Sequence, residues 1–163
     1  MRRDVRIELV LPHPRERVWR ALSDREVLAR WLMPTDFVPE LGRAFTFRMK
    51  PQRGWDGVTH CVVTEIAVGE RVAYSYRGHA RGDKPIACAG IESERVRSLG
   101  RGVFADLDTV LRFTLHDAPG GTRLVMEHAG FEGWKLALVS FVMGQGWKKI
   151  LRTRLPAALD ALA

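Results

Sequence analysis

The chain has 163 residues, of which 46% are hydrophobic and 28% are charged, and 26 Lys and Arg against 19 Asp and Glu give a formal net charge of +7. This length suits one domain with a sizeable buried core, and the composition excludes a disordered chain. The basic residues are spread along the sequence and no basic run has aromatic residues interleaved with it, so we expect solvated surface charge and no specific nucleic-acid site.

The first elements in chain order are a strand and two short helices. Residues 5–11 alternate between apolar and polar side chains, which predicts a half-buried strand. Pro14 is well placed as the first residue of a helix that carries an apolar side to residue 22. A second short helix is predicted over residues 24–32, with Ser23 and Asp24 as candidate N-caps.

Strands dominate the middle of the chain. The connections between them are too short for helical crossovers, so antiparallel pairing is predicted. The turn Pro119-Gly120-Gly121 joins the last two into the clearest hairpin. The predicted strands cover residues 45–49, 60–66, 72–76, 109–115 and 122–128.

Two segments stand apart from this pattern. Residues 79–106 hold several glycines and little periodicity, and we interpret them as an insertion or flap. After Phe131 the chain becomes helical, and apolar residues from Trp147 to Leu162 recur at helical spacing. A kink is predicted near Pro156, because proline has no N–H to bond the carbonyl of Arg152.

Three motifs carry a resemblance to a known family. The run from Pro14 to Asp24 followed by Leu28-Ala29-Arg30-Trp31, the turn Pro119–Leu124, and Glu127–Phe131 followed by Gly146-Trp147 resemble the START-like (SRPBCC) superfamily. Within it, the chain resembles bacterial homologues of the activator of the heat-shock protein 90 ATPase. The resemblance implies one START-like domain over residues 1–163. Its fold would be an α+β helix grip, in which a curved antiparallel sheet wraps a long C-terminal helix.

An apolar pocket between sheet and helix is expected from this fold. The helix has few large side chains where Gly144, Gly146 and Ala158 lie, so a bent sheet would not be filled completely. Trp134, Phe141 and Met143 lie in an apolar lead into the helix that could line the pocket, close it as a lid, or form a dimer interface. The candidate ligand-binding residues are Trp31, Phe47, Trp55, Tyr76, Phe113, His128, Trp134, Phe141, Met143, Trp147 and Leu151.

No catalytic, metal-binding or cofactor-binding motif stands out. The five histidines form no H-x-x-x-H pair, and no nucleophile elbow or phosphate-binding loop is present. The candidates for acid–base chemistry are His128 and two carboxylate pairs whose members would share a strand face. These pairs are Asp106 with Asp108 and Glu92 with Glu94. The simpler interpretation is that they are surface charges that lie beside arginines.

The chain is expected to be cytoplasmic and to lack a transmembrane segment. Its first residues contain no apolar signal-peptide core, and its longest apolar stretch, residues 136–143, is far short of the ~20 residues that cross a bilayer. Cys61 and Cys88 lie among apolar neighbours, which favours buried thiols in a reducing compartment.

Three functions remain open on the sequence. The first is non-catalytic binding of a hydrophobic small molecule such as a lipid, an aromatic or a polyketide-like compound, by a monomer or homodimer. The second is a co-chaperone-like interaction with a heat-shock ATPase, which the family name suggests. That name comes from a eukaryotic relative with an additional domain, whereas a single domain is expected here. The third is a cyclase or hydrolase that uses a pocket carboxylate or histidine.

Overall fold

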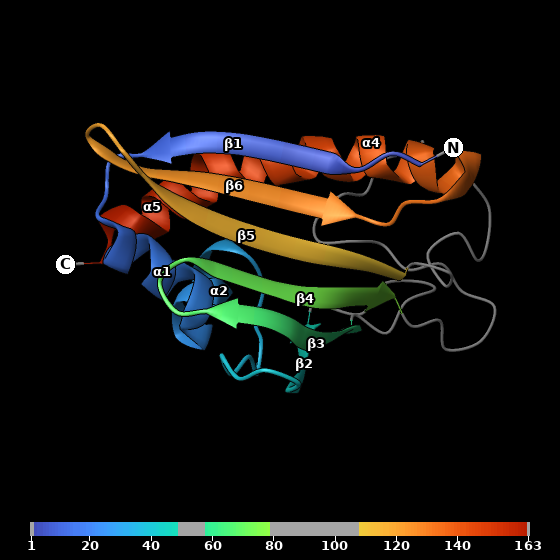
Figure 1. Ribbon diagram of the computed structural model, residues 1–163, viewed down its shortest axis with the longest axis horizontal. Helices are drawn as coiled ribbons and strands as arrows, with labels where there is room; N and C mark the ends of the chain where they lie inside the picture. The colour runs from blue at the N-terminus through green and yellow to red at the C-terminus, as the bar shows by residue number, and fades with distance from the viewer. Residues whose placement is uncertain (1, 49–57, 79–107, 163) are drawn as a thin grey trace.

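The computed structural model describes residues 2–48, 58–78 and 108–162. The fold is α+β, with one six-stranded antiparallel sheet in the order β1-β6-β5-β4-β3-β2 and helices on its inner face (Figure 1). The strands are β1 Val5–Leu11, β2 Ala44–Arg48, β3 Val58–Ala67, β4 Arg71–Gly78, β5 Asp108–Ala118 and β6 Gly121–Ala129. The helices within the described ranges are α1 Arg15–Ser23, α2 Arg25–Trp31, α4 Gly133–Lys149, the π-helical η1 Ile150–Arg154 and α5 Leu155–Asp160. The helix-grip prediction is therefore confirmed.

The two ends of the sheet are covered differently. At one end, where β1 finishes at Leu11 and the hairpin of β5 and β6 turns, α1, α2 and α5 pack together; we call this the helix end. At the other end β2 and β4 finish, β3 and β5 begin, and α4 starts after β6; we call this the far end. Of the described helices, only α4 reaches the far end (Figure 1).

The alternation of the strands separates a core face from a solvent face. In β5, Thr109, Leu111, Phe113 and Leu115 are buried as the sequence predicts. Leu111, Phe113 and Leu115 form one hydrophobic core with matching residues of the other strands and the inward sides of the helices.

The outer face of the sheet is lined with cross-strand ion pairs. Arg6 on β1 lies 3.5 Å from Glu127 on β6, and Arg112 on β5 lies 3.8 Å from the same carboxylate. Glu65 on β3 binds Arg112 at 3.2 Å and Arg71 at 2.7 Å. Exposed pairs of this kind contribute only about 0–1 kcal/mol each, so they balance charge on a solvated face more than they stabilise the fold.

The hairpin between β5 and β6 needs glycine at two positions. Gly120 has φ +78°, which residues with a side chain rarely adopt. A Cβ at Gly121 would overlap the carbonyl oxygen of Leu11 on β1. The turn predicted from Pro119-Gly120-Gly121 therefore also sets how closely β1 approaches the hairpin.

The long C-terminal helix changes its winding before Pro156. The N–H of Leu155 donates to the carbonyl of Ile150, five residues back, which makes residues 150–154 a π-helical turn. A kink was predicted near Pro156, and the structure has a wider turn that ends just before Leu155, the first residue of α5, with Pro156 as its second residue. This turn keeps Leu151 and Leu155 fully buried.

The N-cap of α2 gives a simple stability prediction. Asp24 Oδ1 accepts from the N–H groups of Glu26 at 2.8 Å and Val27 at 3.4 Å, whereas Ser23 Oγ donates to the carbonyl of Trp19. Of the two candidates, Asp24 is thus the cap. We expect Asp24→Ala to lower the free energy of unfolding by about 1 kcal/mol in urea denaturation. Ser23→Ala should stay within about 0.5 kcal/mol of the wild type, and equal losses in the two variants would contradict the assignment.

Candidate functional site

A chain of ring contacts crosses the inner face of the sheet and contains six of the predicted ligand-binding residues. The ring centroids of Phe47 and Tyr76 are 6.4 Å apart, and those of Tyr76 and His128 are 5.2 Å apart. Trp147 on α4 lies 6.1 Å from His128 and 6.3 Å from Phe113. We call these five residues, Phe47, Tyr76, Phe113, His128 and Trp147, the inner aromatic wall.

The remaining candidates fall into four groups. Trp31 continues the chain of rings toward the helix end, 6.2 Å from Phe113. Met143 and Leu151 lie one helical turn before and after Trp147 and are buried in the same core. Trp134 and Phe141 do not join the wall, because their side chains are 63% and 43% exposed on the outward side of α4. Trp55 lies outside the described residues.

His128 is the polar centre of the wall, and its two ring nitrogens are both hydrogen-bonded. Its Nε2 lies 2.8 Å from Thr109 Oγ1, and its Nδ1 lies 3.2 Å from Trp147 Nε1. The indole N–H can only donate, so Nδ1 must be the acceptor. The Thr109 hydroxyl already donates to the carbonyl of Tyr76 at 2.8 Å, so Oγ1 accepts from an N–H on Nε2. The geometry therefore defines a neutral imidazole that carries its proton on Nε2.

Burial favours the same uncharged form. His128 has no exposed surface, and desolvation lowers its pKa to about 3, a shift that the charge of Asp4 opposes only in part. Protonation would also place an N–H at Nδ1 against the N–H of Trp147. The wall therefore carries no formal charge at neutral pH.

Sequence reasoning missed Thr109 and Phe131 as parts of this site. Thr109 is a buried polar residue on the apolar side of β5, which is the signal that could have found it. The ring of Phe131, fully buried between β6 and α4, packs 4.8 Å from the ring of His128. Together they complete the enclosure of the histidine.

The space beside Gly144 faces the first strand of the sheet. Gly144 was expected to leave room at the start of the helix. A Cβ at this position would lie 3.5 Å from a methyl group of Val5, at ordinary contact distance. The room that the glycine leaves is therefore small and lies between α4 and β1, where Gly144 lines a groove.

The candidates for acid–base chemistry do not come together in the part of the chain that the structure describes. Asp108 is on the outer face, where its carboxylate accepts a hydrogen bond from Arg77 at 2.8 Å, while His128 is enclosed on the inner face. Asp106, Glu92 and Glu94 lie outside the described residues, as does the predicted insertion at 79–106. In residues 2–48, 58–78 and 108–162, no three His, Cys, Asp or Glu side chains gather to hold a metal ion.

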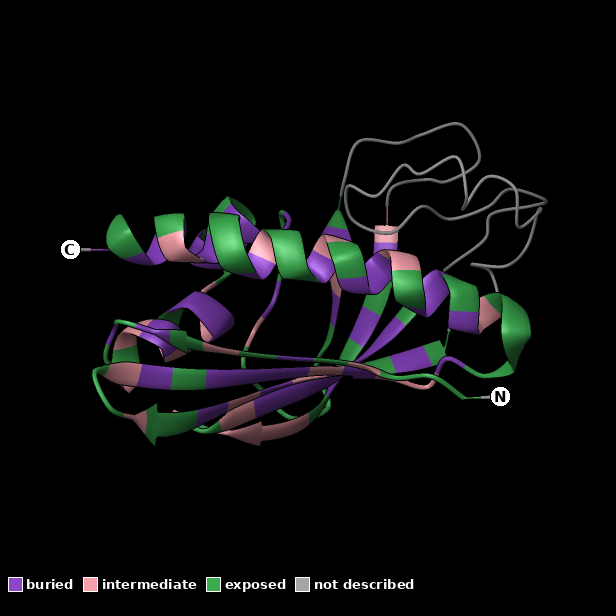
Figure 2. Ribbon diagram, turned by 90° about the horizontal axis from the view of Figure 1, so that it is seen from above, coloured by how far each residue is buried: buried purple, intermediate pink, exposed green. Residues whose placement is uncertain are grey.

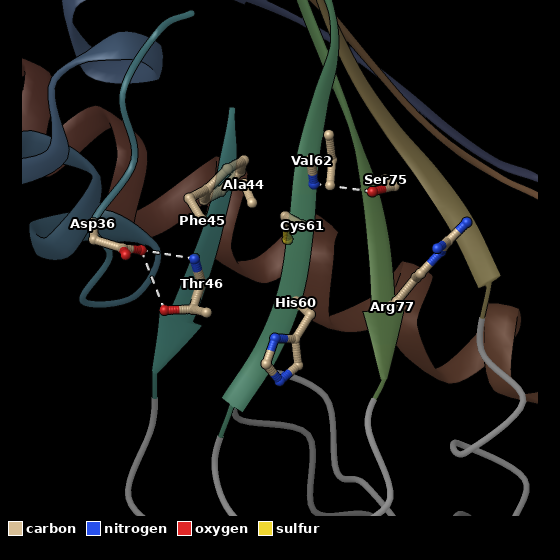
Figure 3. Close-up of a pocket in the computed structure, with 9 residues that line it drawn as sticks. All are labelled: Asp36, Ala44, Phe45, Thr46, His60, Cys61, Val62, Ser75 and Arg77. Carbon is tan, nitrogen blue, oxygen red and sulfur yellow. Dashed lines mark hydrogen bonds between the residues drawn. The ribbon is translucent and has the colours of Figure 1, made fainter. Parts of the chain in front are cut away.

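A groove of about 280 Å³ lies on the outer face, over β2, β3 and β4 (Figure 3). Asp36 points across it to Thr46, accepting from the backbone N–H at 2.7 Å and the hydroxyl at 3.2 Å. The backbone bond is the main reason why the pKa of Asp36 is lowered. Ser75 Oγ accepts from the N–H of Val62 at 2.9 Å. These polar groups already form hydrogen bonds that hold the edge strand β2 and the loop before it. The groove is therefore a weaker candidate for a ligand-binding site than the inner aromatic wall.

Cys61 lies beneath this groove with its thiol in the core. It is 2% exposed, and burial raises the pKa of the thiol far above its usual value. The thiol is therefore protonated and unreactive at neutral pH, as the buried-thiol interpretation expects. Cys88 lies outside the described residues.

Comparison with known proteins agrees with this architecture. The sequence model of the family described as Activator of Hsp90 ATPase homolog 1-like protein matches residues 12–160. Protein MLL2253 from Mesorhizobium loti has a similar structure, with a TM-score of 0.76 and 27% identity over 99% of each chain. Protein Mll3558 from Rhizobium loti is similar with a TM-score of 0.70 and 19% identity over 97% of each chain. Protein BH1534 from Bacillus halodurans has a TM-score of 0.67 and 21% identity over 97% of this chain and 98% of its own. No curated protein sequence matches the chain.

Proposed function

Because the chain belongs to the family of Activator of Hsp90 ATPase homolog 1-like proteins, we propose that it binds a hydrophobic small molecule between the inner face of its sheet and α4. The ligand class is a lipid, an aromatic or a polyketide-like compound, and binding is non-catalytic. The observation that carries the proposal is the inner aromatic wall, a continuous series of rings from β2 through β4, β6 and α4 to β5.

The chemistry of the wall favours an uncharged, apolar partner. Small-molecule sites are mostly apolar, with a few polar groups that fix orientation. Here the hydrogen-bonding groups of Trp147, His128 and Thr109 are satisfied by one another. A ligand that rests on these rings gains from burying apolar surface, and it meets no formal charge that would select an ion.

The position of the wall favours access from the far end. At the helix end, α1, α2 and α5 contact one another over the sheet. Phe47, Tyr76 and His128 come from the last three residues of their strands, close to the far end. A ligand that enters between these strand ends and α4 would reach the wall without displacing the packed helices.

The same geometry gives less support to catalysis. A general base needs a free lone pair that faces the substrate and a pKa near the working pH. Both nitrogens of His128 are engaged, and its lowered pKa keeps it a poor proton carrier. In a binding protein, by contrast, a neutral and fully bonded histidine is a rigid part of the pocket wall.

The test uses tryptophan fluorescence with palmitate and phenanthrene as probes. We expect saturable quenching in the wild type, because a ligand on the wall would touch Trp147. The response should disappear in Trp147→Phe, which keeps an aromatic ring, and persist in Trp19→Phe, the control on α1. Native mass spectrometry of protein purified from its own cells should show extra mass that denaturation removes.

Other results in these two measurements would favour a different function. Absence of quenching together with a bare native mass would overturn the binding proposal. In that case, a raised turnover of a heat-shock ATPase on mixing would establish the co-chaperone alternative.

A further inference from the structure

The outward side of α4 carries an exposed apolar stripe formed by Trp134, Leu138 and Phe141. These residues are spaced by four and three positions, so they lie along one face of the helix. They are 63%, 48% and 43% exposed, respectively. Figure 2 shows this outward side of the long helix as largely exposed. Exposed neighbours of this kind mark a surface that contacts something apolar.

The same helix surface is cationic and has no acidic side chain. Between residues 133 and 154 the chain contains Lys135, Lys148, Lys149, Arg152 and Arg154, and no Asp or Glu. All five are exposed, and none has an acidic partner at ion-pair distance within the described residues. On the sheet face, by contrast, Arg6, Arg71 and Arg112 are paired across strands. Five cations that have no ion-pair partner among the described residues therefore follow one another along α4 and η1.

The N-terminal segment adds to this surface. The guanidinium of Arg3 lies 5.3 Å from the centre of the Phe141 ring, and Lys135 Nζ lies 5.7 Å from the centre of the Trp134 ring. A groove of about 170 Å³ between β1 and α4 is lined by Arg3, Phe141 and Lys148, among others. Its one acid, Asp4, is already bound by the N–H of Gly130 and by Arg2. Cations thus border both ends of the apolar stripe.

We propose that this face of α4 docks on the surface of an anionic lipid bilayer, with Trp134, Leu138 and Phe141 in the interfacial region and Arg3, Lys135, Lys148 and Lys149 at the lipid phosphates. An apolar strip bordered by lysine and arginine is the pattern of helices that lie in a membrane interface. Tryptophan prefers this depth, since its ring is apolar and its N–H is polar. No helix in the described ranges is long and apolar enough to cross a bilayer. The charge complementarity selects a bilayer over a second copy of this chain, whose own cations would repel.

The experiment is vesicle co-sedimentation with phosphatidylcholine alone and with added phosphatidylglycerol. Binding should require the anionic lipid. The triple variant Lys135→Gln, Lys148→Gln, Lys149→Gln should bind roughly a hundredfold more weakly, since each cation near an anionic surface contributes about fivefold. Its control, Arg20→Gln, Arg43→Gln, Arg77→Gln, removes the same charge from residues that have acidic partners and should retain most binding.

The apolar contribution is tested separately. Trp134→Ser, Leu138→Ser, Phe141→Ser should weaken binding at least about tenfold. The control Val10→Ser, Leu41→Ser, Val68→Ser changes three exposed apolar residues elsewhere and should bind as the wild type does. All substituted side chains are exposed, and circular dichroism checks that each variant is folded.

Several outcomes would overturn the proposal. One is no binding of the wild type to phosphatidylglycerol vesicles, and another is equal loss in the variants and their controls. Competition by soluble glycerol phosphate would indicate a site for free phosphate. Conversion of a dimer to a monomer by the stripe variant, without vesicle binding, would assign the face to a second copy. None of these outcomes depends on the interior, so they are distinct from a failure of the small-molecule proposal.

Discussion

The free energy of unfolding is expected to fall by about 4 kcal/mol between pH 6.5 and pH 3 through the titration of His128. In the folded protein this histidine is fully buried and neutral, with its Nδ1 bonded by Trp147 and its Nε2–H bonded to Thr109. A proton can be added only by opposing the Trp147 N–H and charging an enclosed ring. Burial is the main reason why its folded pKa is about 3, and the nearby charge of Asp4 offsets only part of it.

Acid lowers the stability because the unfolded state takes up the proton at a higher pH than the folded state does. In the unfolded chain the histidine has its ordinary pKa of 6.5, so it becomes protonated as the pH drops below that value. The folded state resists protonation until about pH 3. The unfolded state therefore binds one more proton in this window, and stability decreases by about 1.4 kcal/mol per pH unit. Above pH 6.5 both states are neutral and the full stability is present.

Urea denaturation between about pH 5 and pH 7, where ordinary carboxylates stay ionised, measures this slope. His128→Gln should remove it, since an amide has an acceptor and a donor for the same two partners but does not titrate in this range. His116→Gln, which changes an exposed histidine on β5, should keep the slope. An unchanged slope in His128→Gln would show that the histidine is hydrated or charged in the fold.

Alternation along the strands made most of the sheet predictable. Leu111, Phe113 and Leu115 share the core face because side chains on a strand point to opposite sides in turn. A one-residue shift would have exposed all three, so the pattern specifies the register strongly. The two short helices were predictable for a similar reason, since their caps and apolar sides are local features. Only the choice of Asp24 over Ser23 needed the structure.

The state of His128 could not be predicted in the same way. Its alternation with neighbouring strand residues left both faces of β6 open. What decides its chemistry are Thr109 and Trp147, each 19 residues away in sequence. Sequence periodicity contains no information about which donors and acceptors meet across strands. The neutral, enclosed histidine therefore emerges only from the three-dimensional packing.

The role of α4 was equally hidden, because the helix is apolar on both sides. Val139 and Met143 face the core, while Leu138 and Phe141 face outward. In a helix with one apolar stripe, the stripe identifies the side that is buried. In α4 the apolar residues lie on both sides, so the sequence does not identify the buried side. The sequence therefore could not distinguish whether this segment lines the pocket, closes it as a lid or forms a dimer interface. In the structure one face of α4 packs on β1, and Trp134, Leu138 and Phe141 on its other side are exposed.

Trp31 should be the most costly of the tryptophans to truncate. Its side chain is fully buried on α2, its Nε1–H donates to the carbonyl of Ala21 at 2.8 Å, and its ring edge meets Phe113. Trp31→Ala would leave a large cavity and remove the hydrogen bond that joins α2 to α1. We expect the free energy of unfolding to fall by about 3–5 kcal/mol in urea denaturation.

The matched control is Trp134→Ala, which removes the same atoms from a side chain that is 63% exposed. Its effect on stability should stay within about 0.5 kcal/mol. Both tryptophans were predicted from the sequence to contact a ligand. Comparing the two variants shows which of these side chains is needed for the stability of the fold. Similar losses in the two variants would mean that the stripe on α4 is covered by the protein's own core. A large loss of stability in Trp31→Ala alone would show that packing at the helix end stabilises the fold. It would also show that Trp134, on the outward side of α4, is not needed for folding.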